Sequence, residues 1–275
     1  MIFTVAAIVL IVCCGVPAKA TDTGKGVKLP ILMYHSMLKD KAYQGVYVIS
    51  PEIFEKDLQY LQKKGYTAIV MQDLLNYVNK KVPLPSKPVM ITFDDGYYNN
   101  YLYAYPLIKK YNMKMVLSPI GYCTELFSQS VSPDHANYSH CTWDEVNEMI
   151  ASGRVEVQNH TYNLHESKNG RLGAGMKKGE SVSKYTALLN ADLSKMQTEM
   201  KDHTGYTPTT FVYPFGIISD ASLPVIRNLG FQATLTCVNR INYITDDPEC
   251  LYGLGRYLRP GKTASEAYFK KIGLN

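Results

Sequence analysis

Short apolar segments alternate with segments of helical periodicity along most of the chain, and this alternation limits the possible folds more than any other feature. The apolar segments that predict strands lie at 29–35, 67–71, 89–93, 114–119, 154–158, 211–213 and 231–236. Helices are expected between them, at 50–65, 73–80, 99–111, 143–151, 189–200 and 221–229. A repeated strand–helix order favours a parallel sheet covered by helices. We predict an α/β fold, an irregular, distorted (β/α) barrel of about seven parallel strands.

The composition excludes several classes of protein. Hydrophobic residues make up 46% and charged residues 19% of the 275 residues, which argues against an intrinsically disordered chain and against a polytopic membrane protein. The net charge of +5 is small and no basic run concentrates it, so we expect no nucleic-acid partner. The 22 tyrosines would suit a sugar-binding surface, although ordinary half-buried positions are the interpretation that we favour.

The first twenty residues are expected to direct export. Residues 2–16 are almost wholly apolar, and residues 18–20 (Ala-Lys-Ala) form the small-x-small sequence typical of signal-peptidase cleavage. No basic residue precedes the apolar run, so an uncleaved membrane anchor stays open, as does a lipid-anchored Cys13. Each alternative places the expected globular domain, residues 21–275, outside the cytoplasm, either secreted or at the cell surface.

Four cysteines follow this segment, and their spacing favours local disulfide bonds. An even number of cysteines in an oxidising compartment is typical of disulfide formation. The short separations favour the pairs Cys123–Cys141 and Cys237–Cys250, with four buried thiols as the alternative. Each bridge would contribute about 3 kcal/mol in the chain-entropy description of loop closure.

Chemically distinctive residues follow four of the expected strands at the point where each strand ends. They are His35, Asp94 to Gly96, His160 with His165, and Tyr213 to Gly216. Because the carboxyl ends of parallel strands meet at one end of a barrel, we expect these side chains to form one site.

The adjacent aspartates, Asp94 and Asp95, are unfavourable at a strand end unless a cation compensates their charge. Neighbouring carboxylates oppose joint ionisation, but one of them can bind a metal ion while the other acts as a base. The alternative is that one aspartate only caps the following helix. From these two residues alone, both interpretations stay open.

His160 and His165 can contribute to one metal site only under a structural condition. At a separation of five positions, the side chains diverge on a helix and face opposite sides of a strand, so the segment 160–165 must be an irregular loop. Two histidines and one aspartate, with positions left for water, are typical of a catalytic rather than a structural metal site.

Three segments, in sequence order, resemble the motifs of the polysaccharide deacetylases, the NodB-like carbohydrate esterases of family four. Thr92 to Tyr97 is similar to the first motif, His160 to His165 to the second, and Tyr213 to Gly216 to the third. The resemblance covers residues 29–271. It implies a NodB-like distorted barrel and a metal-dependent hydrolase with one divalent ion, usually zinc.

The resemblance also implies roles for individual residues. Asp95, His160 and His165 would bind the metal ion, and Asp94 would be the general base toward a metal-bound water that acts as nucleophile. The backbone N–H of Phe215 would stabilise the oxyanion. A protonated histidine would then donate a proton to the leaving amine.

The sequence departs from the common family pattern at three places. The histidines of the second motif lie five rather than four positions apart, as in a subgroup that resembles the poly-N-acetylglucosamine deacetylases. The arginine that often begins the third motif is missing, so the partner of Asp94 is open; Arg256 is a candidate, although we favour a surface position for it. The usual C-terminal histidine acid is also missing, and Tyr34-His35 matches the subgroup's alternative, so we assign the acid to His35.

Residues in and near the motifs are expected to contact the sugar. They are Tyr97, Trp143, Tyr213 and Pro214, with core packing as the alternative for Trp143. The remaining histidines, His135, His140 and His203, are expected at the surface.

We therefore expect residues 21–275 to form a monomeric catalytic domain that de-N-acetylates an extracellular polysaccharide containing N-acetylglucosamine. Any membrane attachment would involve only the N-terminal segment. The alternatives are an O-acetyl esterase acting on xylan-like polymers and a catalytically weak carbohydrate-binding relative.

Overall fold

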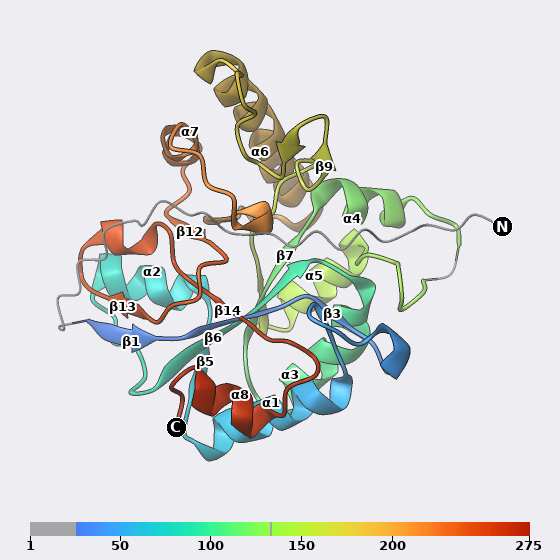
Figure 1. Cartoon of the computed structure of the whole chain (residues 1–275), viewed down its shortest axis with the longest axis vertical. Helices are drawn as coiled ribbons and strands as arrows, with labels where there is room; N and C mark the ends of the chain where they lie inside the picture. The colour runs from blue at the N-terminus through green and yellow to red at the C-terminus, as the bar shows by residue number, and fades with distance from the viewer. Residues whose placement is uncertain (1–25, 133) are drawn as a thin grey trace.

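The alternation of strands and helices gives a parallel sheet at the centre of the molecule (Figure 1). The computed structural model describes residues 26–132 and 134–275, so the expected export segment lies outside the described residues. The six strands of the sheet are β14 (Tyr257–Leu258), β2 (Ile31–Tyr34), β6 (Pro88–Asp95), β7 (Met115–Pro119), β8 (Val155–Val157) and β5 (Thr67–Ile69), which pairs with β6. Every pairing in this sheet is parallel, as predicted.

A second parallel pair continues the wall of the barrel. β11 (Thr210–Val212) pairs with β12 (Ala233–Leu235). Single parallel bridges join Asn159, just after β8, to Phe211, and Leu235 to Leu254, just before β14. The six-stranded sheet and the β11–β12 pair thus together form the wall of a distorted (β/α) barrel. The count of about seven strands stays a prediction, because single bridges rather than full ladders complete the wall.

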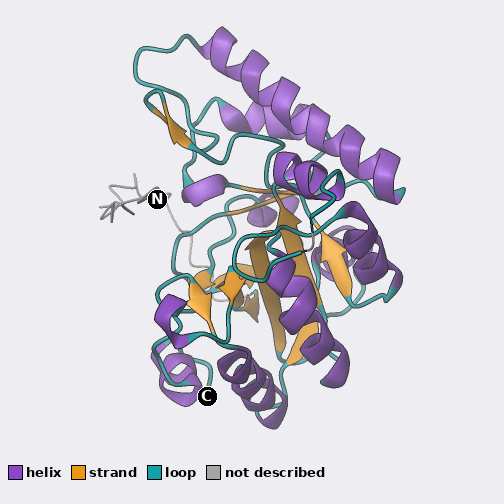
Figure 2. Ribbon diagram, turned by 90° about the vertical axis from the view of Figure 1, so that its right-hand side faces the viewer, coloured by secondary structure: helices purple, strands orange, loops and turns teal. Residues whose placement is uncertain are grey.

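Helices surround the strands (Figure 2). They are α1 (Pro51–Lys63), α2 (Met71–Lys80), α3 (Tyr105–Lys110), α4 (Gly121–Ser128), α5 (Trp143–Ala151), α6 (Val182–Thr204), α7 (Ser222–Asn228) and α8 (Ser265–Lys271). In the part of the chain that the structure describes, no helix is both long and apolar enough to cross a membrane. The sequence predicted most of these helices but missed α4 and α8, each of which is only two turns long.

Shorter elements complete the described chain. β1 (Val27–Leu29) pairs with β13 (Asn242–Ile244), β3 (Ser36–Met37) with β4 (Val48–Ile49), and β9 (Ser167–Lys168) with β10 (Arg171–Leu172). The 3₁₀ helices are η1 (Lys41–Tyr43), η3 (Pro214–Gly216) and η4 (Pro248–Leu251). The helix expected at 99–111 is divided into a π-helix, η2 (Asn100–Ala104), and α3. Pro106 has no N–H to donate, and just before it the N–H of Tyr105 donates to the carbonyl of Asn100, five residues back.

Burial places the core on both faces of the central strands. β6 is buried along its whole length, as expected for the middle of a parallel sheet. The apolar side chains of α6 that repeat at helical spacing are fully buried: Leu189, Leu193, Met196 and Met200. The capping residues act as their sequence suggests, since Ser50 Oγ accepts from the N–H of Ile53 at the start of α1. The core therefore holds the strand ends that carry the distinctive residues in fixed positions.

Neither expected disulfide bond, Cys123–Cys141 or Cys237–Cys250, is present. Cys141 is buried in the core, where its Sγ donates to a backbone carbonyl at 3.3 Å, and Cys123 is half-buried on α4. The Sγ of Cys250 donates to a different carbonyl at 3.9 Å, and the Sγ of Cys237 lies 3.8 Å from the Sδ of Met33. The prediction is wrong because closeness in sequence does not orient two sulfurs toward each other.

Candidate active site

The adjacent aspartates occupy the carboxyl end of β6, where the sequence predicted the site. Both side chains are buried. The chain turns sharply after them, since Asp95 and Gly96 have φ angles of 70° and 72°. A Cβ atom at Gly96 would lie 2.6 Å from the Cβ of Pro119 at the end of β7, so only glycine allows this approach. The turn thereby lets the chain pass close to the end of β7 directly after the two carboxylates at the end of β6.

Asp95 lies against the two histidines of the second motif. Its Oδ1 is 3.5 Å from Nε2 of His160 and 3.3 Å from Nε2 of His165. One ligand atom from each of the three residues lies within 4.8 Å of the other two. The segment 160–165 is neither helix nor strand, which is the condition under which these histidines can share a metal ion.

Hydrogen bonds from two sides hold this loop. The backbone N–H groups of Tyr162 and Asn163 each donate to the carboxylate of Asp192 on α6 at 2.8 Å. The N–H of Thr161, which has a φ of 74°, donates to Oδ1 of Asn159 at 2.9 Å. The loop therefore presents its histidines from a fixed backbone.

The three side chains have the chemistry of a divalent-metal site. Oδ1 of Asp95 is buried and accepts no hydrogen bond from any described residue, so it is a carboxylate oxygen in need of a partner. Nδ1 of His160 is 2.7 Å from the carbonyl of Val212, which orients Nε2 toward the site. Burial and the neighbouring His160 lower the pKa of His165 to about 4, so this imidazole is neutral, as a metal ligand must be.

Arg256 binds Asp94, the other aspartate, in a bidentate pair. Its Nη1 and Nη2 donate to the two carboxylate oxygens at 2.7 and 2.8 Å, and its Nε donates to the carbonyl of Thr236 at 2.9 Å. Arg256 is fully buried, so the favoured interpretation as a surface charge is wrong, and the structure supplies the partner of Asp94 that the third motif lacks. Burial alone would raise the pKa of Asp94, but Arg256, together with His160 and His35, holds it below its usual value.

His35 reaches the same site from the end of β2. Its Nε2 lies 4.0 Å from Oδ2 of Asp94, and 16% of its side chain is exposed. The amide of Asn100 donates to its backbone carbonyl at 2.7 Å, and the ring of Tyr47 packs edge-on against its imidazole. The structure thus brings His35, Asp94, Asp95, His160 and His165 together.

The third motif contributes Phe215 to the site. Its φ is 57°, and its ring centroid lies 4.5 Å from that of His165. Pro214 is buried beside it, and the Tyr213 side chain is buried with its hydroxyl 2.7 Å from the Oγ of Ser222. The expected contact between sugar and the Tyr213 ring is therefore wrong, because that ring is part of the core.

Trp143 and Tyr97, which were also expected to contact the sugar, differ in burial. Trp143 is buried in the core, and His203 stacks on its indole at a centroid distance of 4.8 Å. The expected role of Trp143 in sugar binding is wrong, and core packing is the interpretation that fits. Tyr97 is half-buried next to the acid pair, and burial and Asp95 raise the pKa of its hydroxyl.

One histidine near the site was missed. His140 was expected at the surface, but its Nδ1 lies 3.0 Å from the backbone carbonyl of Asp95 and its ring is 4.9 Å from that of Tyr97. Burial lowers the pKa of His140. No motif marks this residue, and only the antiparallel bridge between Tyr97 and His140 places it behind the acid pair.

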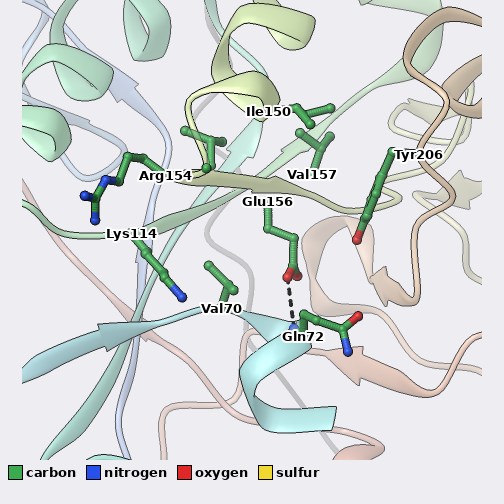
Figure 3. A pocket seen from close by; sticks show the side chains of 10 residues that line it. Val70, Gln72, Lys114, Ile150, Arg154, Glu156, Val157 and Tyr206 are labelled. Carbon is green, nitrogen blue, oxygen red and sulfur yellow. Dashed lines mark hydrogen bonds between the residues drawn. The ribbon is translucent and has the colours of Figure 1, made fainter. Parts of the chain in front are cut away.

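A separate cavity lies at the amino ends of β7 and β8, which are the opposite strand ends (Figure 3). It measures about 240 Å³, and the carboxylate of Glu156 points into it toward the start of α2. The two oxygens of Glu156 accept from the N–H groups of Met71 and Gln72 at 3.1 and 2.9 Å. This carboxylate therefore caps a helix and is not a second reactive group.

A family model described as polysaccharide deacetylase matches residues 81–234, more than half of the chain. The chain belongs to the polysaccharide deacetylase family. The resemblance of the three motifs to this family is therefore confirmed. The prediction that the family consists of hydrolytic enzymes is confirmed with it.

Among curated relatives, the chain is 28% identical to YxkH of Bacillus subtilis, over 78% of this chain and 66% of that protein. It is 27% identical to a poly-β-1,6-N-acetyl-D-glucosamine N-deacetylase of Staphylococcus aureus, over 68% of this chain and 60% of the relative. A protein of the same name from Escherichia coli is 22% identical over 74% of this chain. The chain spans only 33% to 66% of the length of these relatives.

Solved structures show the same fold. A de-N-acetylase from Aggregatibacter actinomycetemcomitans matches with a TM-score of 0.76 and 27% identity, over 89% of this chain and 99% of that one. IcaB from Ammonifex degensii matches with a TM-score of 0.72 and 27% identity, over 90% and 97%. The predicted NodB-like barrel is therefore the fold of this chain.

Proposed function

We propose that the chain is a metal-dependent deacetylase that hydrolyses N-acetyl groups on an extracellular polysaccharide containing N-acetylglucosamine. The observation that carries the proposal is the convergence, at one end of the barrel, of a triad of metal-ligand type, two of whose members are buried, and a separate carboxylate that is held by an arginine. The names of the Staphylococcus aureus and Escherichia coli relatives support the choice of substrate. An extracytoplasmic location follows from that substrate.

Asp95, His160 and His165 would hold one divalent ion, and zinc is the ion that we propose. When bound, the ion would polarise the acetyl carbonyl and make water more acidic. A set of three protein ligands would leave room on the ion for water and substrate.

Asp94 is the proposed general base. Its lowered pKa keeps it ionised, and the bidentate contact with Arg256 fixes the carboxylate plane. In this arrangement Asp94 removes a proton from the water whose oxygen attacks the acetyl carbonyl carbon.

His35 is the proposed acid, and the N–H of Phe215 is the proposed donor to the oxyanion. As the carbon–nitrogen bond breaks, His35 donates a proton to the departing nitrogen, which leaves as the amine of glucosamine while the acetyl group leaves as acetate. Tyr97, half-buried beside Asp95, remains the proposed sugar contact of the first motif.

The test measures acetate release and metal content together. The zinc-loaded protein is incubated with oligomers of β-1,6-linked N-acetylglucosamine, with chitin oligomers and with acetylated xylan. We expect acetate and free amine from the first substrate, loss of both after chelation, and about one metal ion per chain by elemental analysis. Asp95→Ala should lose the ion, whereas Asp57→Asn, a change of another buried aspartate, should keep it.

The other outcomes select the alternatives. Acetate from xylan alone would identify an O-acetyl esterase. Binding of sugar without acetate from any polymer would identify a carbohydrate-binding relative. Full metal occupancy in Asp95→Ala would contradict the ligand set.

A further inference from the structure

An exposed aromatic side chain lies at the edge of the site and has no part in the proposed function. Tyr47 is 54% exposed, yet its ring centroid is only 5.1 Å from that of His35, at an interplanar angle of 69°. Single exposed aromatic residues are common on proteins and need no explanation by themselves. Tyr47 differs from them because it borders the imidazole that we assign as the acid.

The backbone that carries Tyr47 is fixed on both sides. The N–H of Ser36 donates to the carbonyl of Tyr47 at 3.1 Å, and the residues that follow form the parallel β3–β4 pair. The N–H of Gly45 donates to the carbonyl of Val48 at 3.0 Å. Gly261 packs so closely that a Cβ there would lie 2.2 Å from the carbonyl oxygen of Val48. The ring therefore stands on a rigid support, which lowers the entropic cost of using it in binding.

A second aromatic ring lies against the other side of the site. The ring of Phe215 contacts His165, while the ring of Tyr47 contacts His35. Both histidines lie within about 4 Å of the acid pair: His35 is 4.0 Å from Asp94, and His165 is 3.3 Å from Asp95. Each of the two histidines beside the acid pair therefore has an aromatic ring packed against it, and of these two rings only that of Tyr47 is largely exposed.

The physical chemistry of a sugar ring matches an exposed aromatic face. A pyranose has C–H groups on its faces and hydroxyl groups around its rim, so its faces pack on aromatic surfaces while its rim stays hydrated. Tyrosine supplies such a surface with few rotatable bonds and with a hydroxyl that tolerates water. Burial of an exposed ring also adds a favourable hydrophobic contribution.

We propose that Tyr47 stacks on the pyranose next to the one that is deacetylated, so that it is a substrate-binding residue that favours oligomers over single acetyl groups. The proposal rests on the proposed function, since it names how that site recognises its polymer. Tyr47 touches the substrate away from the reacting atoms and is not a catalytic residue.

Binding is tested first, without turnover. In an Asp94→Asn background, a pentasaccharide of β-1,6-linked N-acetylglucosamine is titrated calorimetrically into protein with Tyr47, Tyr47→Ala or Tyr47→Phe. We expect Kd to rise about fivefold in Tyr47→Ala and to return close to the original value in Tyr47→Phe, because the ring supplies the contact. Tyr243→Ala, a change of a similarly exposed tyrosine on β13, is the matched control and should leave Kd unchanged.

Steady-state kinetics on two substrates then distinguish a role of Tyr47 in sugar recognition from an effect on His35. With Asp94 intact, Tyr47→Ala should raise KM for the pentasaccharide about fivefold, with a much smaller effect on a small acetyl ester such as 4-methylumbelliferyl acetate. An equal loss of kcat on both substrates would mean that Tyr47 acts only by holding His35, and it would overturn the proposal.

Two further results are decisive. Equal affinity of the Tyr47 and Tyr47→Ala proteins for the pentasaccharide, or no measurable binding to either, would also overturn the proposal. If the Tyr47→Ala change weakens binding while the wild-type protein releases no acetate, the deacetylase function fails and the role of Tyr47 in sugar binding stands.

Discussion

Arg256 and Arg259 lie in the same short segment of the chain, and each forms a bidentate ion pair with a buried aspartate. Arg256 holds Asp94 at 2.7 and 2.8 Å, and Arg259 holds Asp57 at 2.8 and 2.9 Å. All four side chains are buried. Arg256 binds through Nη1 and Nη2 and Arg259 through Nε and Nη2, but each pair makes two short bonds of nearly the same length.

Their surroundings differ. Asp57 is enclosed, because the hydroxyl of Tyr34 also donates to its Oδ2 at 3.0 Å. Burial raises the pKa of Asp57, and Arg259 only partly offsets this effect. Asp94 instead faces His35, and its pKa is lowered. If Asp94 is the base that we propose, the comparison teaches that a buried ion pair serves catalysis when one side of the carboxylate faces the site, and that it otherwise only holds elements together.

The first prediction separates the two aspartates. Asp94→Asn should lower kcat by about 10²- to 10⁴-fold, because removal of a general base has effects of this size, and the metal content should stay the same. Asp57→Asn should leave the kcat of the folded protein close to wild type and lower its melting temperature. Steady-state kinetics, elemental analysis and thermal melts measure these outcomes. A nearly active Asp94→Asn protein would remove the distinction between the pairs.

The second prediction concerns the enclosed Arg259–Asp57 pair. Arg259→Met should lower the free energy of unfolding by about 3–5 kcal/mol, because the carboxylate of Asp57 loses its buried partner. Urea unfolding at equilibrium gives this value. A loss below 1 kcal/mol would show that water or another group replaces the arginine, and that Asp57 is less enclosed than the structure indicates.

The third prediction replaces each arginine by lysine, which keeps the charge but cannot form the bidentate contact. Arg256→Lys should lower kcat by about tenfold through a less well-oriented base. Arg259→Lys should reduce stability while kcat stays near wild type. If both changes reduce kcat to the same extent, the two pairs do not have separate roles.

The smallest expected effect concerns Tyr34, which donates to Asp57 alongside Arg259. Tyr34→Phe removes one hydrogen bond to Asp57 and should lower the free energy of unfolding by about 1 kcal/mol. Tyr268→Phe, which removes a hydroxyl bonded to the backbone carbonyl of Tyr257, is a matched control for loss of one tyrosine hydroxyl. Equilibrium unfolding compares the two, and a larger loss in Tyr34→Phe would show that the charged acceptor strengthens its bond.

The sequence predicted the parts of the site that local pattern determines. The three proposed metal ligands and Asp94 lie in short motifs at strand ends, and parallel strands bring such ends together whatever the intervening sequence is. Arg256 was not predictable in this way, because its burial depends on the order β14–β2–β6, which brings distant segments side by side.

The errors have a related cause. Trp143 and Tyr213 were expected at the sugar because they lie in or near motifs, but a motif does not show toward which side an aromatic ring points. In the structure both rings face the core. The cysteine pairs failed for the same reason, since sequence separation contains no information on side-chain direction.

The position of Arg256 has a consequence for the order in which the site is completed during folding. The proposed metal ligands lie at the end of β6 and in the loop after β8, whereas Arg256 lies just before β14, which joins the sheet only by pairing with β2. A folding intermediate in which β14 is still unpaired would contain every proposed ligand while Asp94 lacks its cation. In such an intermediate a metal ion could bind before the proposed base is ready, so the docking of β14 would be the step that completes the site.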